Sequence, residues 1–321
     1  MDDYYSSIKK ENLVNSHGVR YYDFLETMPP RYSIVWVHLL SGHLSIVVVS
    51  LASILIGVRN PSLIPILVLL SSIILGYAVA YIMLFIHEAA HYNLAKSRKK
   101  NDILANIFIG SLLGLHIKDY REIHWGHHRY HGQINDPEHI YFDPLNISFF
   151  VESLSGIKLI RVFLDRNKRL KGSDPVLGQK SWESKMMMVA GLFINGTIIL
   201  FSFWSGYLFF ILIWLAAFMI FFPFFASLRP ILEHRDEHAK ASIDYSKVPH
   251  GVTNRLLGDG PITSTFGGAG FNRHLLHHIE PKVSYTRLRE FETYLMDTQF
   301  KEEIKRHKTT YWKTFKNLFQ F

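Results

Sequence analysis

The sequence predicts an all-α integral membrane protein, with four transmembrane helices in two hairpins and a helical cap. Three observations predict this fold. The apolar residues are concentrated in two long blocks without Asp, Glu, Lys or Arg, nearly all basic residues lie outside these blocks, and histidines cluster at or beyond their ends. The chain has 321 residues, which we expect to form a single domain over 1–321.

The first apolar block is interrupted once, at Val58-Arg59-Asn60-Pro61. The segments on either side of it, 33–57 and 62–86, contain none of the four charged residue types. Because a membrane-spanning helix needs about 20 apolar residues, we predict spans at about 34–57 and 62–86.

The second apolar block covers 186–228 and also lacks those four residue types. Its best candidate for a turn is Trp204-Ser205-Gly206, so we predict spans at 186–204 and 207–228. The alternative is four buried helices of a soluble protein. It is disfavoured because these charge-free runs are longer than a soluble core requires.

Basic residues predict the topology. Two hairpins leave 1–33, 87–185 and 229–321 on one side, and that side carries 34 of the 35 Lys and Arg residues. Since basic residues favour the cytoplasmic face, we expect these three segments to form a cytoplasmic cap. The net charge of +8 would suit anionic lipid headgroups or an acidic protein partner. A shorter apolar stretch, 103–115, predicts a helix that lies in the interface or re-enters it.

Several classes of site are disfavoured. Without cysteine the chain has no disulfide, thiolate metal site or thiol catalysis. We find no nucleic-acid motif and no phosphate-binding loop, and we expect Gly267-Gly268-Ala269-Gly270 to form a turn. No cleaved signal peptide is evident at the N-terminus.

The 18 histidines carry the strongest functional signal. Residues spaced i, i+3 and i+4 share one face of an α-helix, and three clusters have this spacing. They are His87 and His91; His124, His127 and His128; and His274, His277 and His278. A further pair, His234 and His238, follows the last predicted span.

Three helices with this spacing can direct eight imidazoles toward one centre. Eight are too many for one zinc ion, which usually takes four ligands, but two six-coordinate ions would accommodate them. Imidazole without thiolate suits iron, zinc, copper or nickel, and iron is indicated if O2 is a reactant. His87-Glu88-Ala89-Ala90-His91 also matches the pattern of zinc proteases, but that interpretation leaves six of the eight histidines unused.

With these boxes, hairpins and cap, the chain resembles the membrane fatty acid desaturase family, which includes lipid hydroxylases and carotenoid ketolases. The resemblance covers roughly 34–290. It implies a di-iron centre with nine histidine ligands: His87, His91, His124, His127, His128, His234, His274, His277 and His278. His238 is the rival of His234 for the ninth position. His131 is expected to be an outer contact or an alternate ligand. Proximity to the boxes suggests Glu88, Asp136 and Asn272, with Glu122 and Glu233, as outer partners of the imidazoles.

The resemblance implies an O2-dependent oxidoreductase that introduces a double bond into a fatty acyl chain linked to lipid, coenzyme A or acyl carrier protein. Hydroxylation or ketolation of a lipid or carotenoid is the alternative, and an intramembrane zinc protease is a remote one. Two electrons would come from a ferredoxin or a cytochrome b5-type donor, because the sequence has no flavin, haem or cysteine-cluster signature.

Overall fold

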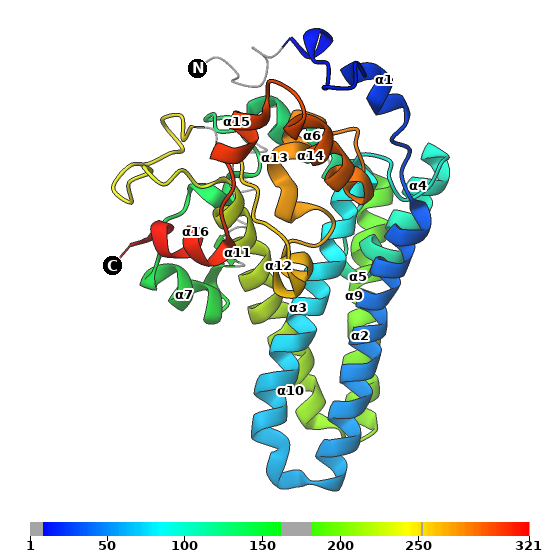
Figure 1. Cartoon of the computed structure of the whole chain (residues 1–321). Helices are drawn as coiled ribbons and strands as arrows, with labels where there is room; N and C mark the ends of the chain where they lie inside the picture. The colour runs from blue at the N-terminus through cyan, green and yellow to red at the C-terminus, as the bar shows by residue number, and fades with distance from the viewer. Residues whose placement is uncertain (1–8, 159, 162–180, 252, 321) are drawn as a thin grey trace.

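The computed structural model describes residues 9–158, 160–161, 181–251 and 253–320 (Figure 1). Parts of the predicted cap, 1–8 and 162–180, lie outside the described residues. The chain is mostly helical, and four described helices are long and apolar enough to cross a membrane. They are Tyr32–Arg59, Pro61–Ala90, Trp182–Trp204 and Leu208–His234. The prediction of a helical protein with four candidate spans is confirmed.

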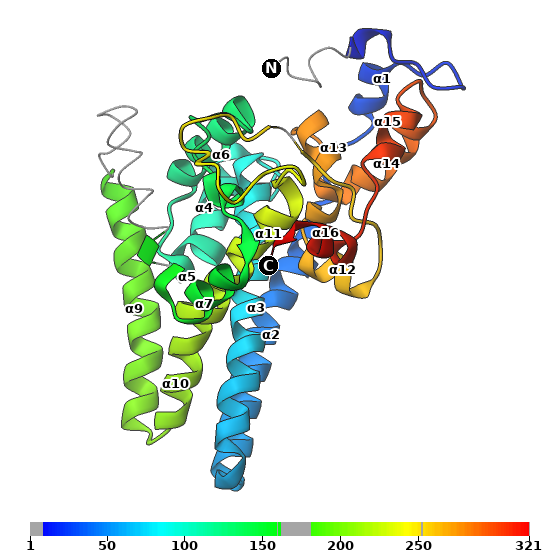
Figure 2. The same cartoon turned by 90° about the vertical axis from the view of Figure 1, so that its left-hand side faces the viewer.

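The first two candidate spans are α2 (Tyr32–Arg59) and α3 (Ile64–Ala90), joined by a 3-10 turn at Pro61–Leu63. They lie side by side in Figures 1 and 2. Gly42 allows their close approach, because a Cβ there would lie 2.8 Å from Cγ1 of Ile82. With 27 residues, α3 is about 40 Å long, longer than a hydrocarbon core of about 30 Å. The helix is therefore long enough to place His87 beyond the hydrocarbon core of a membrane.

The other two candidate spans are α9 (Trp182–Trp204) and a composite helix. The latter consists of α10 (Leu208–Ala216), a π-helical turn at Ala217–Phe221 and α11 (Phe222–His234). The chain turns between α9 and α10 at Gly206, which has a φ of +77°. The helix continues past 228, the predicted end of the span, to His234. The charge of Arg229 marks the end of the apolar block, whereas the helical hydrogen bonds continue to His234.

The short apolar segment 103–115 lies mostly in one helical run that begins at Arg98 and includes a π turn. It contains the end of α4 (Arg98–Ala105), a π turn at Asn106–Gly110 and α5 (Ser111–Leu113), and it stops at Gly114, whose φ is +67°. The Nε2 atom of His43, a residue of α2, lies 2.8 Å from the Phe108 carbonyl oxygen. This contact fixes the segment against the first candidate span.

The remaining elements gather at one end of the long helices (Figure 1). They are α1 (Tyr21–Glu26), α6 (Ile117–Tyr130), β1 (Leu145–Asn146), α7 (Ile147–Leu154), α12 (Pro261–Phe266), α13 (His274–Ile279), α14 (Leu288–Met296), α15 (Lys301–Arg306), α16 (Tyr311–Leu318) and β2 (Phe319–Gln320). The two short strands pair in parallel. The Gly267–Gly270 run forms the predicted turn between α12 and a 3-10 turn at Phe271–Arg273.

Candidate metal centre

The first histidine box lies where α3 ends. His87 is in its last turn and His91 is the residue after the final helical position, Ala90. The chain then reverses at Tyr92, which has a φ of +63°. The Arg121 guanidinium lies 4.1 Å from the Tyr92 ring centroid and fixes this turn. The two imidazoles are buried, with ring centroids 5.1 Å apart.

The second box lies on α6 and divides its imidazoles between two directions. His124 and His128 are one turn apart, and their Nε2 atoms are separated by 3.0 Å. The His124 Nε2 atom lies 2.9 Å from Nε2 of His91. His127 faces away from this set, and its ring contacts that of His131 at 4.7 Å.

The third box lies on α13, which meets both sets. The Nε2 atom of His277 is 3.0 Å from that of His128. His278 and His274 have their Nε2 atoms 3.1 Å apart, and His274 is 2.9 Å from Nε2 of His234, the last residue of α11.

The imidazoles therefore form two groups. In group one, His87, His91, His124, His128 and His277 each offer a ligand atom within 4.8 Å of the others. Group two consists of His127, His131, His234 and His278 by the same measure, and His274 adjoins it through His234 and His278. All nine histidines expected as ligands lie in or against these groups.

The groups fit a pair of metal ions. Several buried imidazole nitrogens have no hydrogen-bond partner among the described residues, including both nitrogens of His87 and the Nε2 atoms of His127 and His131. Nitrogens bound to one ion at about 2.1 Å lie about 3.0 Å apart when they are neighbours at a right angle. The observed Nε2 separations, from 2.9 to 3.1 Å, match this spacing.

Electrostatics favours neutral imidazoles that can act as ligands. Burial, reinforced by the neighbouring imidazoles, lowers the pKa of His91, His128, His274, His277 and His278. Burial also lowers the pKa of His124. His127 differs, because the Asp136 and Glu138 carboxylates outweigh its burial and raise its pKa to about 9. A metal ion would displace the proton held at its Nε2.

Carboxylates behind the rings fix their orientation. Asp136 is buried, and each of its carboxylate oxygens lies 3.0 Å from Nδ1 of His127. Glu138 accepts similarly from Nδ1 of His124 at 3.1 Å. The Tyr141 hydroxyl donates to Asp136 at 2.5 Å. These contacts keep the Nδ1 protons on the outside and direct the Nε2 atoms toward the groups.

The other expected outer partners behave differently. The Asn272 side chain donates to the Gly258 carbonyl, and its backbone bonds to Leu257 and Gly267, so its partners among the described residues are not histidines. Glu88 accepts from Ser284, and its nearest oxygen is 4.0 Å from Nδ1 of His87. Glu122 is exposed, whereas Glu233 lies within 4.8 Å of His234 and His274. Among these residues, the structure thus places Asp136 directly against a box histidine, whereas Asn272 hydrogen-bonds elsewhere and Glu122 is exposed.

The structure also shows where the remaining candidate residues lie relative to the two groups. His238 is exposed and belongs to neither group, whereas His234, the other residue considered for the ninth position, lies in group two. His131 is buried inside group two. Glu138 and Tyr141 were not expected at the centre. The signal for Glu138 was its place two residues after Asp136, whereas the sequence around Tyr141 carried none.

Comparison with known families agrees with this geometry. Residues 64–315 match the fatty acid desaturase family. The chain belongs to the fatty acid desaturase family. The matched range includes the nine histidines of the two groups, His274 and nearly all of three of the four candidate spans, so the family assignment covers the centre itself. No curated protein and no solved structure matches the chain. Family membership indicates an oxidoreductase that acts on lipid at a membrane, and the histidine groups could bind metal.

Proposed function

We propose that this desaturase-family chain is an O2-dependent di-iron enzyme that introduces a double bond into a fatty acyl chain. The observation that carries the proposal is the pair of adjacent histidine groups. To group one α6 contributes two imidazoles, and to group two it contributes one, together with His131, the residue that follows the helix. Group one would hold one iron, and group two with His274 would hold the other. Two bound irons would supply the O2-dependent oxidation that removes a hydrogen from each of two neighbouring carbons.

An apolar pocket beside group one supports an acyl substrate. It lies between α3, α11 and α12, and its lining includes Tyr81, Leu84, Phe225 and Phe266. Leu84 is one helical turn before His87, so a chain bound in the pocket would pass close to group one. Arg229 also lines the pocket, and its guanidinium lies 3.7 Å from the ring centroid of Phe271, which in turn contacts His87 at 4.5 Å. These side chains would align the substrate and exclude water from it.

We further propose the arrangement in the membrane. The four candidate spans would form two hairpins, and 1–33, 87–185 and 229–321 would face the cytoplasm, because 34 of 35 basic residues lie there. The whole chain, 1–321, would act as one domain. Its basic surface would suit an acidic electron donor, either a ferredoxin or a cytochrome b5-type protein, and an acyl group carried by lipid, coenzyme A or acyl carrier protein.

Two alternatives remain as outcomes of the test. A hydroxylase or ketolase would use the same ligands and differ only in its product. A zinc protease would need Glu88 free to act as a base on water. The Glu88 carboxylate instead accepts hydrogen bonds from the Ser284 hydroxyl and the Tyr285 amide, and three further imidazoles lie beside His87 and His91. This geometry favours the oxidase.

The test combines lipid analysis with metal analysis. A host expressing the chain should accumulate an unsaturated acyl product that is absent with His128→Ala and present with His238→Ala, the exposed control. Purified protein should contain about two irons per chain, and anaerobic reduction followed by O2 should yield the alkene. An alcohol or ketone as the sole product would refute desaturation, and a single zinc per chain would refute the di-iron centre.

A further inference from the structure

The third histidine box lies on a helix that has little stability of its own. α13 has six residues, His274–Ile279, and isolated helices shorter than about 12 residues are marginal in water. Its last turn supplies His277 to group one and His278 to group two. The position of this turn therefore sets the geometry of both groups.

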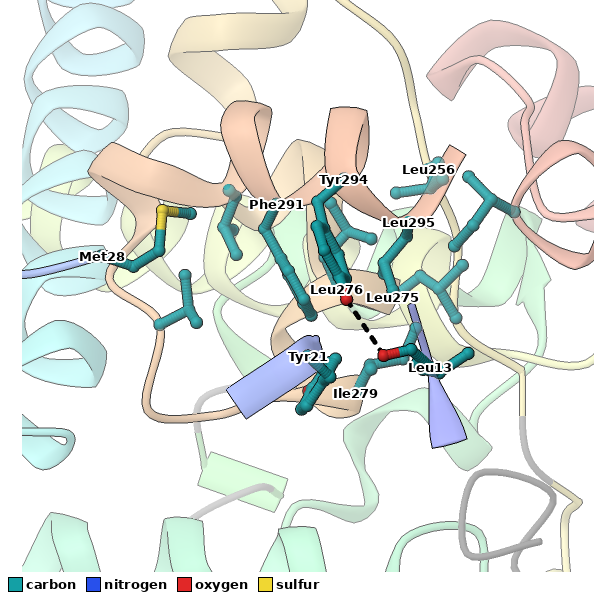
Figure 3. Close-up of a cluster of buried hydrophobic side chains, with 13 residues drawn as sticks. Leu13, Tyr21, Met28, Leu256, Leu275, Leu276, Ile279, Phe291, Tyr294 and Leu295 are labelled. Atoms are coloured by element: carbon teal, nitrogen blue, oxygen red, sulfur yellow. Dashed lines mark hydrogen bonds between the residues drawn. The ribbon is translucent and has the colours of Figure 1, made fainter. Parts of the chain in front are cut away.

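The face of α13 opposite the histidines is held by the N-terminal segment. Leu275, Leu276 and Ile279 are buried in a hydrophobic cluster that also contains Leu13, Tyr21 and Met28 (Figure 3). Residues far apart in the sequence thus form one core directly behind the imidazoles. Burial of these apolar side chains is what holds the short helix in place.

Polar contacts fix the same segment at the end of α13. The Lys10 ammonium donates to the Ile279 carbonyl at 2.6 Å and to the Glu280 carboxylate at 3.3 Å. The Tyr21 hydroxyl, on a fully buried side chain, donates to the same Glu280 oxygen at 3.0 Å. A cation that binds the last carbonyls of a helix stabilises its C-terminus. Lys10 and Tyr21 therefore act at the residues that directly follow His278.

Further contacts attach the segment to α14. The Tyr294 hydroxyl lies 3.3 Å from the Leu13 carbonyl oxygen (Figure 3) and 3.1 Å from that of Val19. The Ser16 hydroxyl donates to Asp297 at 2.7 Å. Because α14 packs in the same cluster as α13, the segment is anchored on both sides of Glu280.

We propose that residues 10–31 form a strap that fixes the third histidine box, with Lys10 and Tyr21 as positioning residues for His277 and His278. The inference rests on the proposed metal centre. Without either partner, the Glu280 carboxylate, whose side chain is 10% exposed, loses a hydrogen bond and the last turn of α13 is free to move. The metal ions would then be held less tightly, with no change in any ligand.

The chain offers matched controls at adjacent positions. Lys9 and Tyr22 carry the same side chains as Lys10 and Tyr21 but are exposed. The full chain, purified in detergent and loaded with Co(II), is challenged with excess chelator, and the loss of Co(II) is followed by its visible absorption. Outer contacts of metal ligands typically contribute 10–100-fold in affinity. We expect Lys10→Met and Tyr21→Phe to release Co(II) about tenfold faster, Lys10→Arg to restore most of the retention, and Lys9→Met and Tyr22→Phe to release at the wild-type rate.

The outcomes separate the strap from the proposed reaction. Wild-type release rates for both Lys10→Met and Tyr21→Phe, or equal acceleration in the two controls, would overturn the strap. Should Lys10→Met fail to fold, Tyr21→Phe still decides, since it removes a single hydroxyl. A wild type that binds no Co(II) overturns the metal centre and the strap together. A wild type that retains Co(II) and, loaded with iron, makes no alkene overturns the reaction alone.

Discussion

Asp136→Asn tests the histidine groups without altering any expected ligand. The buried Asp136 carboxylate accepts from Nδ1 of His127 at 3.0 Å, the Tyr141 hydroxyl at 2.5 Å and the amides of Glu138 and Gly132 at 2.9 and 3.4 Å. Each oxygen of this carboxylate accepts from a backbone N–H. In the Asp136→Asn variant the side-chain NH2 group would replace one oxygen and would face that N–H, donor against donor. The His127 ring loses a charged acceptor as well.

The expected magnitude follows from these contacts. A hydrogen bond to a charged group contributes about 1.5–3 kcal/mol, and about 1.4 kcal/mol is a factor of ten. Loss of the hydrogen bond that orients His127 should lower the affinity of group two for its metal ion about 10–100-fold. Outer contacts of other metal ligands have effects of this size. Group one does not include His127 and should retain its ion.

The assay is metal content after dialysis against graded chelator. Wild type should show about two ions per chain with similar retention, whereas Asp136→Asn should lose one ion at 10–100-fold lower chelator. Glu122→Gln is the control, because Glu122 is an exposed carboxylate on the same helix as His127. Wild-type retention of both ions by Asp136→Asn would refute the role assigned to this carboxylate.

Three further predictions concern other parts of the molecule. His131→Ala should remove one ion per chain in the same dialysis assay; two ions retained would show that His131 only packs beside group two. Ala226→Phe should lower conversion of long acyl chains while metal content stays constant, because Ala226 lines the pocket beside α3; an unchanged product profile would argue against substrate in that pocket. Gly76→Ala should destabilise the protein by about 1–3 kcal/mol in an unfolding assay, since its Cβ would lie 2.5 Å from that of Phe221. Gly196→Ala is the matched control, with open space around its Cβ, and equal stability of the two variants would contradict the packing argument.

The sequence by itself determined the candidate spans and the histidine boxes. Charge-free runs of more than 20 residues are a local property, and so is the i, i+3, i+4 spacing that puts imidazoles on one helical face. The sequence did not determine how far a helix continues past its apolar residues, as α11 does past 228, or where a π turn lies, as within 103–115. Both depend on backbone hydrogen bonding and not on where the apolar residues stop.

Tertiary structure decided how the histidines are shared. His127 and His128 are neighbours in sequence, yet they belong to different groups, because the His91 ring from the end of α3 lies against His128 and the His234 ring from α11 lies against His127. The His131 ring also lies against His234, at 4.5 Å between ring centroids, whereas His238 is exposed beyond the end of α11. The contact of Lys10 with Ile279 joins residues 269 positions apart. No local pattern encodes such a contact, because it depends on how separate helices pack and not on the period of any one of them.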